Sequence, residues 1–240
     1  MTLDEARKKI IFALDVNGIG EIGRLSGMLS GRVGMFKVGK ELFTACGPSS
    51  VKAIRKLGID VFLDLKFHDI PNTVARAVVE AARLGASLVN LHALGGGEMM
   101  ECAVKAVEKE FGSDRPKLLA VTILTSSTES TLRQVGISEP LEDMVTRLAR
   151  LARKSGMDGV VASPREIPFI RESCGDDFLV VTPGIRPIFA SADDQKRIMT
   201  PSEAVRAGAD YLVIGRPIAG ASDPAVAADM IADEIAGSAP

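Results

Sequence analysis

The segment 64–66 carries the clearest chemical signal in the sequence. Asp64 and Lys66 stand two positions apart in an apolar run, and alternate residues of a strand point to the same face. A carboxylate and an ammonium group are therefore expected side by side. Lys37 from the preceding apolar run and Asp69 just beyond would extend the pair to an alternating Lys–Asp–Lys–Asp cluster, whose members could pair with one another and with a ligand.

Simpler interpretations exist for the members of this cluster. Asp64 and Lys66 could form an ion pair that only fills the protein interior, although a buried charge costs several kcal/mol unless it is paired. Asp69 could cap the helix that starts near Pro71. Asp15, which ends the first apolar run, could be a turn residue or a ligand.

A second group of residues could bind a phosphate. Gly215 ends an apolar run and Arg216 follows it, while Arg186 follows another run. Backbone N–H groups at a helix start and bidentate arginines are common phosphate ligands. The segment 185–198 is long for a plain connection and is expected to act as a lid. A turn with a solvated arginine is the alternative for Gly215 and Arg216.

Metal and disulfide chemistry are not expected. His68 and His92 are the only histidines, and a site with nearby aspartates is conceivable, but Lys37 and Lys66 would place cations where a metal needs ligands. We predict no metal and no cofactor, and a hydrogen-bonded role for His92. The three cysteines are odd in number and form no CxxC motif, which favours a reducing, cytoplasmic setting.

The elements that position these residues alternate along the chain. Eight short apolar runs are typical of strands buried on both faces of a parallel sheet; they span 10–15, 35–39, 61–66, 88–92, 118–124, 159–163, 178–184 and 211–215. Amphipathic patterns at 74–84 and 141–154 predict helices between them. Eight such units predict an α/β protein, a (β/α)8 barrel. An open doubly wound sheet is the competing architecture.

Composition narrows the class of protein. The 240 residues are 46% hydrophobic and 25% charged, with a net charge of −2 and no tryptophan. Binding of nucleic acid through a basic surface is therefore not expected. No run of 18 apolar residues occurs and the N-terminus does not have the features of a signal peptide, so no membrane association is expected. Without a linker-like segment, residues 1–240 are predicted to form one domain.

The stretch 62–73 resembles the orotidine 5'-monophosphate decarboxylase family. It matches the family's DxKxxDIxxT pattern without a departure, and further matches follow in family order at 13–15, 36–39, 121–126, 182–186 and 213–217. The stretches 185–186 and 194–195 resemble the bacterial form of the family. The resemblance implies a cytoplasmic, homodimeric (β/α)8 barrel. It also implies cofactor-free decarboxylation of orotidine 5'-monophosphate to uridine 5'-monophosphate, the last step of de novo synthesis of that nucleotide.

The resemblance also implies catalytic roles. Lys66 would be the proton donor to C6 of the pyrimidine, with Asp64 beside the departing carboxylate. Lys37 and Asp69 would complete the charge network, and Asp69 and Thr73 would reach into the partner's site across the dimer.

Binding roles follow from the same resemblance. Asp15 and Lys37 would hold ribose hydroxyls, and Thr125 would contact the pyrimidine edge. The 5'-phosphate would be bound by Gln195, Arg216 and the Gly215 backbone, with Arg186 on the phosphate side as in the bacterial type.

Two other functions are weighed against this one. Magnesium-dependent sugar-phosphate decarboxylases or aldolases of the same barrel group are expected to carry an acidic residue on the second strand, and Lys37 stands there instead. A catalytically silent nucleotide-binding barrel is expected to lose one of the four charged residues, and all four are present.

Overall fold

Eight parallel strands close into a barrel in sequence order. The computed structural model describes residues 1–189 and 199–237. Strand β8 pairs with β1, so the barrel prediction is confirmed and the open doubly wound sheet is excluded. The strands are β1 (Ile10–Ala13), β2 (Met35–Gly39), β3 (Asp60–Phe67), β4 (Leu88–His92), β5 (Lys117–Val121), β6 (Gly159–Val161), β7 (Leu179–Pro183) and β8 (Tyr211–Ile214).

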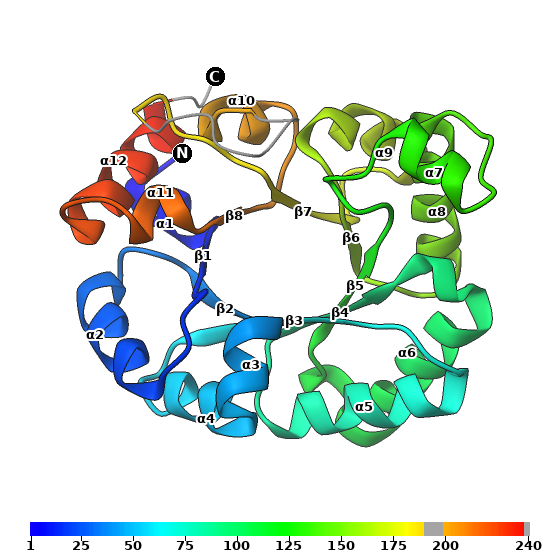
Figure 1. Ribbon diagram of the computed structural model, residues 1–240, viewed down its shortest axis with the longest axis horizontal. Helices are drawn as coiled ribbons and strands as arrows, with labels where there is room; N and C mark the ends of the chain where they lie inside the picture. The colour runs from blue at the N-terminus through cyan, green and yellow to red at the C-terminus, as the bar shows by residue number, and fades with distance from the viewer. Residues whose placement is uncertain (190–198, 238–240) are drawn as a thin grey trace.

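Helices surround the ring of strands (Figure 1). The predicted helical segments 74–84 and 141–154 correspond to α5 and α8. The helices are α1 (Leu3–Lys8), α2 (Ile19–Leu29), α3 (Lys40–Cys46), α4 (Pro48–Arg55), α5 (Pro71–Arg83), α6 (Gly97–Phe111), α7 (Glu129–Gln134), α8 (Leu141–Lys154), α9 (Ile167–Cys174), α10 (Pro201–Arg206), α11 (Arg216–Ala219) and α12 (Pro224–Gly237), with short 3-10 turns η1 (Ala93–Gly95), η2 (Gly112–Asp114) and η3 (Pro164–Glu166).

The interior of the barrel is filled by apolar side chains from all eight strands. This inner cluster consists of Ile11, Met35, Phe62, Leu88, Leu119, Val121, Val161 and Val181, flanked by Leu179, Tyr211 and Val213. A second, larger layer of buried residues lies between the strands and the helices. The barrel therefore has no open channel, and a ligand can be reached only at an end of the barrel.

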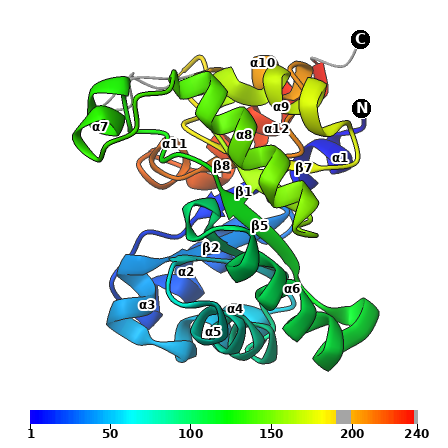
Figure 2. The same ribbon diagram turned by 90° about the vertical axis from the view of Figure 1, so that its right-hand side faces the viewer.

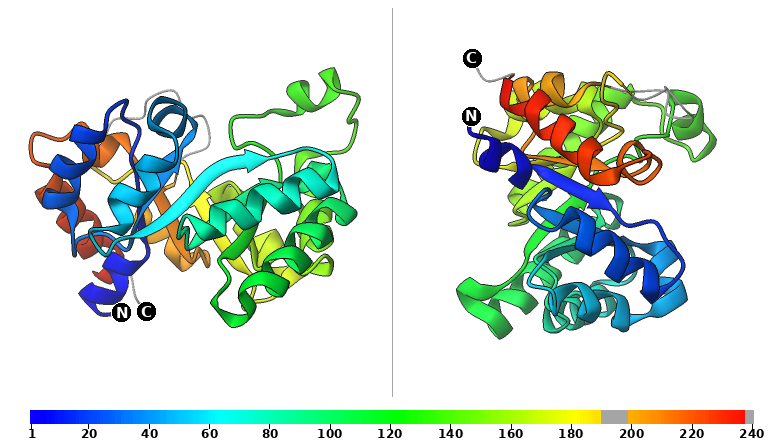
Figure 3. Two further views of the ribbon diagram at one scale, coloured as in Figure 1. Left: turned by 90° about the horizontal axis from the view of Figure 1, so that it is seen from below. Right: turned by 90° about the vertical axis from the view of Figure 1, so that its left-hand side faces the viewer.

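The two ends of the chain and one connection complete the architecture. The terminal helices α1 and α12 pack against each other (Figure 3). Helix α7, in the connection after β5, projects beyond the carboxyl end of that strand (Figure 2). In the described segments no helix combines the length and the apolar character needed to cross a bilayer.

Candidate active site

Four charged side chains meet at the carboxyl ends of β1, β2 and β3. Lys37 Nζ lies 3.1 Å from Asp15 Oδ1 and 3.5 Å from Asp64 Oδ2. Lys66 Nζ donates to Asp64 Oδ1 at 2.5 Å. Acidic and basic groups thus alternate in the order Asp15, Lys37, Asp64, Lys66. The structure brings together three members of the predicted cluster and adds Asp15, which is therefore an ion-pair partner as well as the residue that follows β1.

A glycine makes room for this array. Gly39 ends β2, and a Cβ atom there would lie 2.8 Å from Lys37 Nζ and 3.4 Å from Asp15 Oδ1. Any larger residue would displace the Lys37 ammonium group, which is buried in the barrel mouth. The absence of a side chain at position 39 is therefore required for the Asp15–Lys37 contact.

Strand β3 is irregular where it carries the charged pair, which corrects the sequence-based argument. The register against β4 shifts between Leu63 and Phe67, and Lys66 has a φ of 55°. Asp64 and Lys66 are therefore not alternate residues of a regular strand. Their side chains still meet, since Lys66 Nζ donates to Asp64 Oδ1.

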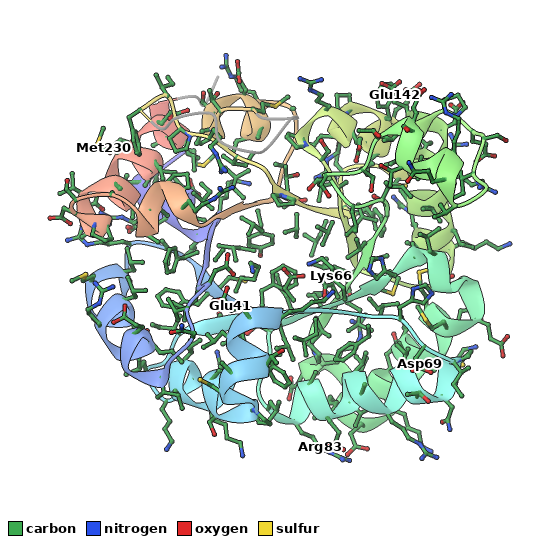
Figure 4. The ribbon with its side chains drawn as sticks, in the orientation of Figure 1. Glu41, Lys66, Asp69, Arg83, Glu142 and Met230 are labelled. Carbon is green, nitrogen blue, oxygen red and sulfur yellow. The ribbon has the colours of Figure 1, made fainter. Side chains whose placement is uncertain are left out.

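These groups form one wall of a cavity of about 170 Å³ at the barrel mouth. Lys37, Asp64 and Lys66 make its charged side. The other lining residues come from β3 and from β5 to β8 and the segments that follow β5, and most of them are apolar: Phe62, Val121, Ile123, Leu124, Thr125, Val161, Pro183 and Val213. Apolar walls exclude water and strengthen electrostatic interactions at the charged side. Figure 4 shows Lys66 within the ring of strands.

Asp69 and Thr73 lie apart from this array. Asp69 is exposed, its carboxylate accepts the Ile70 N–H at 2.7 Å, and within residues 1–189 and 199–237 it forms no ion pair. Figure 4 places it outside the strands, near the start of α5. It does not cap α5, whose N-cap residue is Ile70. Thr73 is exposed in the first turn of that helix. Within one chain, the predicted four-residue cluster therefore lacks Asp69.

Three of the predicted phosphate ligands follow the ends of β7 and β8 in the chain: Arg186 after β7, and Gly215 and Arg216 after β8. Gly215 immediately precedes the short helix α11, and the exposed Arg216 is its first residue. Arg186 is buried, and its Nη1 donates to the Ile185 carbonyl oxygen at 3.1 Å. Gln195, and most of the predicted lid at 185–198, lie outside the described residues.

The two histidines form a pair beside the array. Their ring centroids are 5.6 Å apart. Burial lowers the pKa of His92 to about 4, and the neighbouring His68 and Lys66 act in the same direction. The predicted hydrogen bond of His92 is not found in the part of the chain that the structure describes. His92 is therefore a neutral ring at pH 7 and adds no charge to the array.

One buried polar residue was not assigned a role from the sequence. Asn90 on β4 is fully buried and contacts both Asp64 and Lys66 through its side-chain amide. The only signal for it in the sequence is an amide inside an otherwise apolar run. That signal does not reveal what the amide contacts, because the contacts depend on the register between β3 and β4.

Together the fold and the site define a (β/α)8-barrel enzyme with an ammonium–carboxylate array at the carboxyl ends of its strands. The model of the family described as "Orotidine 5'-phosphate decarboxylase / HUMPS family" matches residues 8–231, and the chain belongs to that family.

Relatives and solved structures agree with this assignment. The chain is 72% identical over 240 residues to the orotidine 5'-phosphate decarboxylase of Pelobacter propionicus, covering 100% of both chains. It is 70% identical over 236 residues to that of Geobacter sulfurreducens, covering 98% of this chain and 99% of the relative. The structure of orotidine 5'-phosphate decarboxylase from Lactobacillus acidophilus superimposes with a TM-score of 0.84 at 39% identity, covering 94% of this chain and 98% of that chain.

The lowered pKa of His92 predicts a pH dependence of stability. An unfolded histidine binds its proton near pH 6.5, whereas folded His92 does so only near pH 4. Between these values the unfolded state binds more protons, so the free energy of unfolding falls as the pH falls from 6.5 to 4. The His92→Gln variant should lose less stability over this range, measured as urea midpoints at pH 7 and pH 4.5. Equal losses in both proteins would contradict the assignment.

Proposed function

We propose that the chain decarboxylates orotidine 5'-monophosphate to uridine 5'-monophosphate, with Lys66 as the proton donor to C6 of the pyrimidine. The carrying observation is the position of the Lys66 ammonium group. It lies in the lining of a cavity whose opposite walls are apolar, and it is held 2.5 Å from Asp64. Family membership supports the substrate and the reaction.

The chemistry requires an electrophilic group at the reacting carbon. When the bond between C6 and the carboxylate breaks, CO2 leaves and the electron pair stays on C6, where the ring offers no electron sink. A nearby ammonium group stabilises the developing negative charge, most strongly where water is excluded. The same Lys66 ammonium then donates its proton to C6, and the neutral amine that remains regains a proton from solvent.

Asp64 and Lys37 support this step from either side. Asp64 Oδ1 binds the Lys66 ammonium, so an entering substrate carboxylate must share that cation with a second carboxylate. The repulsion between the two carboxylates is relieved when CO2 departs. Lys37, paired to Asp64 and Asp15, offsets the negative charge of Asp64.

Removing the Lys66 ammonium group tests the proton-donor role. We expect Lys66→Ala to lower kcat by about 10⁴-fold, because it removes both the acid and the charge that faces C6. The measurement is the loss of absorbance of orotidine 5'-monophosphate with enzyme pre-treated with a chelator. The matched control is Lys105→Ala, which removes an exposed lysine of α6 and should leave kcat unchanged.

The outcomes of this experiment are distinct. Wild-type turnover that survives the chelator, and disappears in Lys66→Ala, agrees with a cofactor-free reaction. Turnover that returns only with magnesium would favour the metal-dependent alternative, and near-normal turnover in Lys66→Ala would remove Lys66 from the proton transfer.

The remaining parts of the nucleotide are proposed to extend from the cavity over the ends of neighbouring strands. Asp15 and Lys37 would bind ribose hydroxyls, and Thr125, which lines the cavity, would contact the pyrimidine edge. The 5'-phosphate would be bound by Arg216 and the Gly215 backbone, together with Arg186 and with Gln195, which lies outside the described residues. The exposure of Arg216 beside the start of α11 supports this placement.

The phosphate site is tested by comparing two substrates. Arg216→Ala should lower kcat/KM for orotidine 5'-monophosphate by about 10- to 100-fold, the range for a lost charge-assisted hydrogen bond. Orotidine, which lacks the phosphate, should be affected by less than about threefold. Equal losses for the two substrates would show that Arg216 does not act through the phosphate.

We further propose a homodimer in which Asp69 and Thr73 complete the partner's site. Both are exposed at or just before the start of α5, and Figure 4 places Asp69 outside the ring of strands that surrounds Lys66. Ile70 between them is 67% exposed, so an apolar side chain lies on the same surface segment as Asp69 and Thr73. An acidic group brought by the partner would extend the alternating array beyond Lys66.

Hybrid dimers test the shared site. A heterodimer of an Asp69→Ala chain and a Lys66→Ala chain contains one site with both residues and one with neither. Random mixing of equal amounts should therefore restore about one quarter of wild-type activity, since half of the dimers are mixed. Each variant alone provides the control. No recovery in a sample whose heterodimers are demonstrated by mass would contradict the shared site.

We also propose that residues 1–240 act as one barrel domain in the cytoplasm. The support for a reducing compartment is that Cys46, Cys102 and Cys174 are free thiols. The support for one domain is the closure of the strands between residues 10 and 214 into a single barrel.

A further inference from the structure

Lys66 has a backbone conformation that its residue type disfavours. Its φ of 55° is the only positive φ at a non-glycine position among residues 1–189 and 199–237. For a residue with a Cβ atom the left-handed conformation costs about 1–3 kcal/mol. It persists only where surrounding contacts impose it, so the structure must contain groups that hold Lys66 in place.

The strand ladder does not supply those contacts. Pairing between β3 and β4 is interrupted between Leu63 and Phe67, and pairing between β2 and β3 ends at Gly39 and Asp64. The Lys66 N–H therefore has no partner in either neighbouring ladder. A buried N–H without an acceptor would add a further cost to the strained backbone.

Asn90 satisfies this N–H and binds Asp64 at the same time. Its side-chain oxygen accepts the Lys66 N–H at 2.9 Å, and its side-chain nitrogen donates to Asp64 Oδ1 at 2.7 Å. The same Oδ1 atom accepts the Lys66 ammonium at 2.5 Å. The three residues thus form a closed ring of hydrogen bonds that includes both the backbone and the side chain of Lys66.

We infer that Asn90 is a positioning residue that sets the direction of the Lys66 ammonium group and the orientation of the Asp64 carboxylate. The inference rests on the proposed function of Lys66. Asn90 is fully buried and is absent from the described residues that line the cavity, so it acts through Lys66 and Asp64 and does not touch the substrate. Without it, the strained backbone would relax and the ammonium group would move relative to C6.

Two variants separate positioning from packing. Asn90→Leu keeps the volume of the side chain and removes both hydrogen bonds. Since a displacement of about 1 Å can cost on the order of 100-fold in rate, we expect kcat for orotidine 5'-monophosphate to fall about 100-fold. KM, and the Kd of uridine 5'-monophosphate, should stay within about threefold of wild type, because the phosphate and ribose contacts are intact.

Asn90→Asp gives a readout that a packing role would not produce. At low pH the introduced carboxyl is protonated, accepts the Lys66 N–H and donates to Asp64, as the amide does. At high pH it is ionised and faces the Asp64 carboxylate, and the repulsion displaces it. The ratio of variant to wild-type kcat should fall by about tenfold per pH unit above the pKa of the introduced group. The titratable and charged groups near position 90 are Asp64, Lys66, Lys37 and His92, and comparison with wild type at each pH isolates the pH dependence that the substitution introduces.

Thr122→Val is the matched control. Thr122 is fully buried after β5, and its hydroxyl donates to the Val161 carbonyl oxygen at 3.3 Å, a hydrogen bond that includes neither Asp64 nor Lys66. Its loss should lower the melting temperature as a buried hydrogen bond does while kcat stays within about twofold. The control separates a loss of stability from a loss of positioning.

The possible results distinguish a failure of the proposed function from a failure of the positioning role of Asn90. Wild-type enzyme without turnover would overturn the proposed function. Active wild type, with kcat of Asn90→Leu within threefold or with a loss confined to KM, would overturn the positioning role. If Asn90→Leu does not fold, the test rests on Asn90→Asp. A ratio of Asn90→Asp to wild-type kcat that does not change with pH would then overturn the positioning role. A reduced kcat with unchanged KM, and a ratio that falls with pH, support the positioning role.

Discussion

Mutual neutralisation of charges in the barrel mouth is the constraint on which the rest of the site depends. An ammonium group at the end of an apolar barrel is stable only with a carboxylate beside it. Lys37 and Asp64 come from adjacent strands, and neighbouring strands lie about 4.8 Å apart. Closure of the barrel therefore brings the two groups to the 3.5 Å at which they pair. Asp15 and Lys66 extend the same arrangement at its two ends.

The apolar half of the barrel makes this arrangement chemically useful. The walls contributed by β5 to β8 exclude water from the side facing the array, so the Lys66 charge is little screened at the reacting carbon. The inner cluster fills the interior of the barrel. Side chains at the mouth of the barrel therefore cannot move into that interior. One set of residues, buried for stability, thus also sets the dielectric environment of the reaction.

Much of this was predictable from the sequence because it depends on local patterns. The eight apolar runs predicted the strands. The charged residues near the ends of these runs predicted that Lys37, Asp64 and Lys66 would lie together at one end of the barrel. The irregular backbone of β3 and the contacts of Asn90 were not predictable, since they depend on the register between strands separated in sequence. The roles of Asp69 and Thr73 in a partner's site are implied by the family motif alone, because their proposed partners lie on another chain.

The alternation of Asp15, Lys37, Asp64 and Lys66 gives this array of four side chains a formal charge of zero. Such a site needs no counter-ions from solution, so ligand entry releases few ions from it. Salt screens charges on an exposed rim far more than charges that are enclosed. Ionic strength should therefore act where a ligand's phosphate is first captured, near the exposed Arg216, and hardly at the carbon that reacts. Recognition and chemistry are therefore exposed to different solution conditions.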